Sequence, residues 1–245
     1  MRTLSFLAIV IASGLLAGLV HGMVNIAFVE PYLDRAIGIE NLRLFSEGQA
    51  KDTPQFWQQF SDYRIWQKQG SIVAGAMLGM ATGALFGLVF AYSRNILPGN
   101  NDIKKALILA GIMWTVLYFI PFLKYPANPP TVGEPTTIVF RATTFALFVA
   151  LSGLGAFGFS RIYKKLKNKK FLAFVGYAAF IGIVFVVMPP NPDPIRTSMD
   201  IVNGFRAISA VTMTVYWIAN GIILGWMWKK VKPDVENQKS SKVTT

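Results

Sequence analysis

The chain has 245 residues, of which 53% are hydrophobic and 15% charged, and its net charge is +12. Soluble domains usually carry about 25% charged residues, so the composition argues against a water-soluble protein and against nucleic acid as the target of the basic charge. The chain contains no cysteine, which excludes disulfides, thiolate metal sites and a cysteine nucleophile.

Apolar residues come in blocks of roughly 20, the length that crosses about 30 Å of hydrocarbon as a helix. We therefore predict an all-α, polytopic transmembrane helix bundle over residues 1–232, followed by a polar cytoplasmic tail over 233–245. The first block is too long for a signal peptide and is expected to remain as a helix. About six spans are predicted, at residues 4–29, 71–93, 104–123, 141–161, 171–188 and 206–228.

The first span begins a glycine pattern that continues in the second span. Small residues at intervals of four let two helices approach closely in lipid, so this ridge predicts helix packing. Its members are Gly14, Gly18, Gly22, Gly75, Gly79, Gly83 and Gly87.

His21, the only histidine, lies beside this ridge, with Met23 and Asn25 following and Glu30 at the end of the span. Imidazole, thioether, amide and carboxylate groups can together bind a borderline divalent metal. A histidine that is hydrogen-bonded to a neighbouring helix is the alternative, and the sequence leaves both open.

The connection over residues 30–69 is predicted to be an outer, amphipathic loop. Its aromatic residues have mostly helical spacing between polar ones, which indicates a helix at the membrane interface. We interpret the aromatic stripe as packing rather than ligand recognition.

Basic residues are concentrated at both termini and after the second and fourth spans, whereas the other loops have equal numbers of acids and bases. The whole net charge therefore lies on one side of the membrane. The positive-inside rule makes this side cytoplasmic and predicts a multi-pass protein of the cell membrane with both termini in the cytoplasm.

The loops after the third and fifth spans share a sequence, Pro126–Pro129 and Pro189–Pro192, and each precedes a Phe-Arg-Ala. This predicts a parallel, two-helix internal repeat. The loops also offer oxygen ligands suited to a divalent cation. These candidates are Asn128, Glu134, Asn191 and Asp193. The matching arginines, Arg141 and Arg206, are expected to form ion pairs at the outer face or to anchor the helix ends.

No hydrolase or nucleotide-binding motif is present in the sequence, so we expect no enzyme activity and no permanently bound cofactor.

Four segments resemble the CbtA family of proposed cobalt transporter subunits: Gly14–Leu19, Val29–Pro31, Phe122–Pro130 and Met188–Pro194. The resemblance implies cobalt as the cargo and a small, one-span companion subunit with a histidine-rich tail. It also implies five spans, one fewer than the charge pattern predicts. A membrane scaffold or accessory subunit that anchors a partner without transporting is the alternative function, and a transporter of another cargo is a third.

Overall fold

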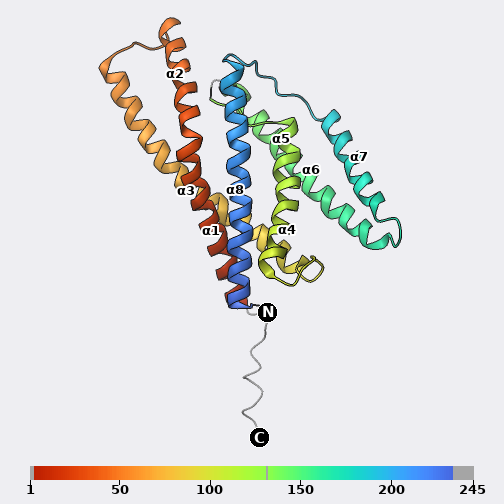
Figure 1. Cartoon of the computed structure of the whole chain (residues 1–245). Helices are drawn as coiled ribbons and strands as arrows, with labels where there is room; N and C mark the ends of the chain where they lie inside the picture. The colour runs from red at the N-terminus through yellow and green to blue at the C-terminus, as the bar shows by residue number, and fades with distance from the viewer. Residues whose placement is uncertain (1–2, 131, 234–245) are drawn as a thin grey trace. The chain divides into compact units, whose positions relative to one another are not determined.

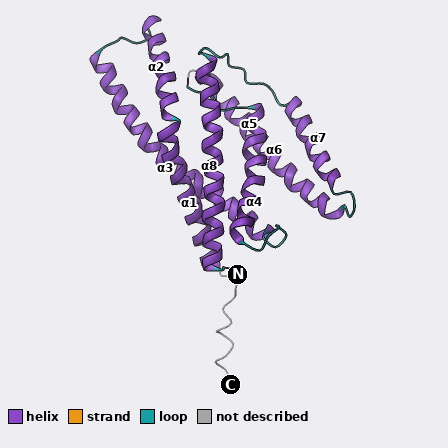
Figure 2. Ribbon diagram, viewed as in Figure 1, coloured by secondary structure: helices purple, strands orange, loops and turns teal. Residues whose placement is uncertain are grey.

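The structure is a computed structural model that describes residues 3–130 and 132–233. All regular elements in these two ranges are helices (Figure 2). The α-helices are α1 (Thr3–Phe28), α2 (Glu30–Ser46), α3 (Pro54–Ser93), α4 (Asp102–Trp114), α5 (Ile120–Lys124), α6 (Ile138–Lys165), α7 (Phe171–Val187) and α8 (Met199–Val231). A π-helical turn, η1 (Thr115–Phe119), joins α4 to α5, and a 3-10 turn, η2 (Pro135–Thr137), precedes α6.

The predicted all-α bundle of about six spans is confirmed. Five helical stretches are long and apolar enough to cross a membrane: Thr3–Phe28, Pro54–Ser93, Asp102–Lys124, Pro135–Lys165 and Met199–Val231. The sixth, α7, is apolar but has only 17 residues. At 1.5 Å per residue it would rise about 25 Å, slightly less than the hydrocarbon thickness.

The segment over residues 30–69 is more regular than the predicted outer loop. Its first part is α2, which follows α1 after a break at Val29, because Pro31 has no N–H to bond to the carbonyl of Ala27. Its second part is not a separate interfacial helix but the beginning of α3, which continues into the span without interruption for 40 residues. Such a helix is about 60 Å long and extends well beyond the hydrocarbon.

The described residues divide into two compact units. One contains residues 3–27, 57–112 and 212–233, and the other contains residues 28–56 and 113–211. The chain passes from one to the other within or next to helices, so that α8 contributes to both (Figure 1). We refer to the first as the terminal unit and to the second as the central unit.

In the terminal unit, α1 and α3 pack through their glycines. A Cβ added to Gly79 would lie 2.6 Å from the Cα of Gly18 and would overlap the carbonyl oxygen of Gly14. Gly75 and Gly83 approach α1 as closely, while Gly87 faces the side chain of Val10. The backbones are therefore in direct contact, a separation that any larger residue would prevent.

Aromatic residues of α8 fill the rest of the core of the terminal unit. The ring of Trp228 makes edge-to-face contacts with Phe6 of α1 and Phe90 of α3, at centroid distances of 5.9 Å and 5.0 Å. Trp217 packs in the same way on Phe86. These contacts hold α8 against the glycine-packed pair of α1 and α3.

In the central unit, α6 and α7 form an antiparallel hairpin (Figure 1). Its core consists of Phe148, Val184 and Met188. The π turn η1 packs on α6, and the hydroxyl of Ser152 donates a hydrogen bond of 2.6 Å to the carbonyl of Val116. Pro121, five residues after Val116, has no N–H for this carbonyl, so the hydroxyl supplies the missing donor.

Candidate functional site

The two proline-rich loops of the central unit contact each other. The Tyr125 hydroxyl donates to the carbonyl of Pro189 at 2.5 Å, and the Thr137 hydroxyl donates to the Asp193 carboxylate at 2.8 Å. An ion pair of 2.8 Å joins Arg196 to Glu134. Proline prevents regular helix in both segments, and these side-chain contacts take the place of a backbone hydrogen-bond ladder.

The two matching arginines bind across this pair of loops. Arg141, at the start of α6, forms an ion pair of 2.9 Å with Asp193 of the second loop. Arg206, near the start of α8, donates from Nε and one terminal nitrogen to Oδ1 of Asn128 in the first loop, at 3.1 Å and 2.8 Å. Each arginine therefore binds the proline-rich loop that precedes the other arginine.

These contacts occupy most of the predicted oxygen ligands. Asp193 has a side chain only 2% exposed and is paired with Arg141, Glu134 is paired with Arg196, and Asn128 accepts from Arg206. Asn191 is exposed, and its side-chain oxygen accepts the backbone N–H of Asp193 at 3.1 Å. Over residues 3–130 and 132–233, no three His, Cys, Asp or Glu side chains are grouped closely enough to hold a metal ion.

A cavity of about 760 Å³ lies beside the loops, within the central unit. Its charged lining residues are Lys124, Arg141, Asp193 and Arg206, and its polar ones include Tyr125, Asn128 and Asn191. Burial raises the pKa of the Tyr125 phenol, and a hydrogen bond with Thr144 offsets part of this rise. Glu30, the acid predicted at the end of the first span, is buried at the start of α2 and does not line the cavity.

His21 and Asn25 lie in the terminal unit, one turn apart on α1, and their side-chain nitrogens Nε2 and Nδ2 are 3.1 Å apart. The His21 ring, in a residue that is 8% exposed, meets the ring of Tyr216 edge-on at a centroid distance of 5.5 Å. The Tyr216 hydroxyl is hydrogen-bonded to Thr82 and lies 3.4 Å from the amide nitrogen of Asn220. A polar cluster from α1, α3 and α8 thus crosses the interior of this unit, and we call it the interior cluster.

A family model described as a probable cobalt transporter subunit (CbtA) matches residues 3–229. The chain belongs to the CbtA family. The match includes both units and all the predicted spans, and it confirms the family resemblance of the sequence. No curated protein and no solved structure matches the chain.

Sequence reasoning about this CbtA family member missed three members of the interior cluster: Thr82, Tyr216 and Asn220. Asn220 could have been found in the sequence, because an amide in an apolar span needs partners that lipid does not supply. In the structure it is fully buried. Its Oδ1 has no hydrogen-bond partner among the described residues. Tyr216 precedes it by four residues and thus lies on the same face of α8.

Proposed function

We propose that this chain is the membrane-spanning subunit of a divalent-cation transporter and that its cargo is cobalt. The family match over residues 3–229 is the observation that carries the proposal. The apolar helices agree with it, since they are long enough to surround a path through a bilayer. The sequence has no catalytic motif, so the role is transport without enzyme activity.

The interior cluster is the part of the chain that we assign to contact with the metal. Imidazole nitrogen is a good ligand for cobalt, and the amide oxygens of Asn25 and Asn220 are weaker ones. His21 is buried, and binding at Nε2 would replace its contact with Asn25. Uncharged ligands suit a path, because a cargo that is held less tightly can also leave.

The oxygen atoms of the outer loops have a smaller part in this proposal. A cation would have to displace a guanidinium group from Asn128, Glu134 or Asp193 before it could bind there. The exposed Asn191 and the carboxylate of Glu30 remain candidates for the approach of the metal. With one histidine and no cysteine in the chain, we assign metal capture to a companion subunit with a histidine-rich tail.

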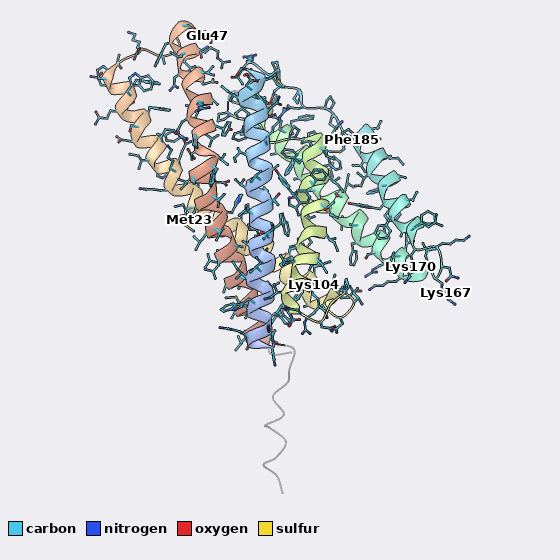
Figure 3. The ribbon with its side chains drawn as sticks, viewed as in Figure 1. Met23, Glu47, Lys104, Lys167, Lys170 and Phe185 are labelled. Carbon is cyan, nitrogen blue, oxygen red and sulfur yellow. The ribbon has the colours of Figure 1, made fainter. Side chains whose placement is uncertain are left out.

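The orientation that we propose follows the charge distribution. The chain is a multi-pass protein of the cell membrane with both termini in the cytoplasm. Lys167 and Lys170 lie at the turn between α6 and α7 (Figure 3), and both are exposed. This basic turn would face the cytoplasm.

Cobalt uptake by cells that lack their own cobalt importer tests the proposal, with this chain, the companion subunit, or both expressed. We expect uptake only with both. His21→Ala should lower the initial rate about tenfold, which corresponds to about 1.4 kcal/mol. Leu16→Ala, on the same helix and at a residue that is 43% exposed, is the matched control and should leave the rate unchanged.

The amount of folded protein in the membrane must be measured for each variant. Glu30→Gln, measured in the same way, tests whether a carboxylate helps the metal to approach. If uptake needs only the companion, the chain would be a scaffold that anchors its partner. Normal uptake by His21→Ala would remove the interior cluster from the path.

A further inference from the structure

The cavity of the central unit has a surplus of positive charge. Arg141 is neutralised by Asp193, whose side chain is almost fully buried in this contact. Two more cations, Lys124 and Arg206, line the same cavity, and neither forms an ion pair with a carboxylate among the described residues. The cavity therefore carries two cations whose charge no acidic side chain in these ranges balances.

The surroundings of the two cations leave them able to bind a ligand. The Lys124 ammonium lies 4.8 Å from the ring centroid of Phe185, which is labelled in Figure 3. A ring face attracts a cation but does not neutralise it. Arg206 binds Asn128 through Nε and one terminal nitrogen. The two N–H groups of its other terminal nitrogen can donate to a ligand.

The two cations also share one cavity of substantial volume. Basic side chains at helix ends commonly reach toward the membrane surface, and this alone would explain one exposed lysine or arginine. Here both cations, from α5 and α8, lie on the wall of one hollow of about 760 Å³. Aromatic side chains, including Phe122, Phe140 and Phe145, form much of the remaining wall.

We propose that this cavity binds an anion through a phosphate or carboxylate group, with Lys124 and Arg206 as the groups that recognise it. Guanidinium and ammonium groups together form the usual partners of such oxyanions. A free divalent cation is disfavoured between Lys124 and Arg206, because both cationic side chains repel it. The anion comes either from solution or from the headgroup of an acidic lipid, and the two sources share this chemistry. The proposal is independent of the transported cargo.

Thermal unfolding of the purified full-length chain in a neutral detergent tests the inference. Phosphate and citrate are added at constant ionic strength, with sodium chloride as the control salt. In a parallel series, nanodiscs of phosphatidylglycerol are compared with nanodiscs of phosphatidylcholine. We expect one series to raise the Tm in a saturable manner. A response to phosphate or citrate identifies a soluble anion, and a response to phosphatidylglycerol alone identifies a lipid headgroup.

Arg206→Gln and Lys124→Gln should each raise, about tenfold, the ligand concentration that gives half of the increase in Tm. Arg161→Gln and Lys167→Gln remove the same charges from the other end of α6 and from the α6–α7 turn, and they are the matched controls. If Arg206→Gln fails to fold because Asn128 loses its partner, Lys124→Gln decides the test. The proposal would be overturned if neither anion source raised the Tm more than sodium chloride or phosphatidylcholine does. Equal losses in the control variants would overturn it as well.

Discussion

Arg141 and Arg206 each stand in a Phe-Arg-Ala sequence but meet different partners. The partner of Arg141 is the buried carboxylate of Asp193, whereas the partner of Arg206 is the neutral amide of Asn128. The sequence predicted ion pairs or anchoring at the outer face for both arginines, and Arg141 forms such a pair. It could not indicate Asn128, because the choice of partner depends on how two loops without regular hydrogen bonding fold against each other.

The two loop carboxylates differ in burial, so removing them should have unequal effects. Asp193→Asn should destabilise the protein by about 1–3 kcal/mol, because it leaves the Arg141 guanidinium without its charged acceptor. Glu134→Gln should cost less than about 1 kcal/mol, since the ion pair with Arg196 is well exposed to solvent. Thermal unfolding in detergent measures both. Equal losses in the two variants would mean that burial does not control the strength of these pairs.

Only part of the interior cluster could be predicted from the sequence. His21 and Asn25 were identified because each is a polar residue on a single apolar helix. Tyr216, the ring neighbour of His21, was not identified, since tyrosine in a span is common and only the packing of α8 brings its ring against His21. The assignment of metal contact to these residues stays a prediction.

At the scale of the helices, hydropathy predicted the spans well and the end of one helix poorly. Hydropathy marks the part of a helix that lipid surrounds, and it has no signal for a helix that continues into water. For this reason the polar half of α3 was predicted as a separate segment, although the backbone is continuous from Pro54 to Ser93. The π turn η1 also has no signature in hydropathy.

The glycine contact between α1 and α3 gives a prediction for these helices. Gly79→Leu should strongly reduce the amount of folded protein, because even its Cβ would overlap the backbone of Gly14. Gly70→Leu, on the same helix, is the matched control, since a Cβ at Gly70 has no atom within 4 Å. Size-exclusion profiles and thermal unfolding compare the two. Wild-type behaviour of the Gly79 variant would show that this contact does not hold the helices together.

At the scale of the whole molecule, the net charge of +12 is concentrated in the termini and in the loops after the second and fourth spans, and this distribution predicts the orientation. Single cysteines at Asn100 and Asn168 should be protected from a membrane-impermeant reagent added outside intact cells, and a cysteine at Thr136 should react. The chain has no native cysteine, so each variant has a single reactive site. Labelling at position 168 in intact cells would reverse the orientation proposed for the α6–α7 turn.

The labelling position in the loop between α5 and α6 is chosen from the structure. Gly133 lies in the same loop, but its φ of +127° is a conformation that other residues rarely adopt. A Cβ there would also collide with the guanidinium of Arg141. Thr136 is exposed and avoids both problems. The internal repeat that suggested comparing these loops stays a prediction.

The π turn η1 also takes up one residue of the third span without changing its angular phase. Each residue of an α-helix turns the chain by about 100°, and a π turn contains roughly one residue more than an α turn. Deleting one residue within Thr115–Phe119 would therefore leave an ordinary α turn, with Lys124 and Phe122 still at the cavity wall. Deleting one residue from the regular part of α4 would instead rotate the residues that follow by about 100° and turn both side chains away from that wall. The third span thus tolerates the loss of a residue at η1 more readily than the loss of one in α4.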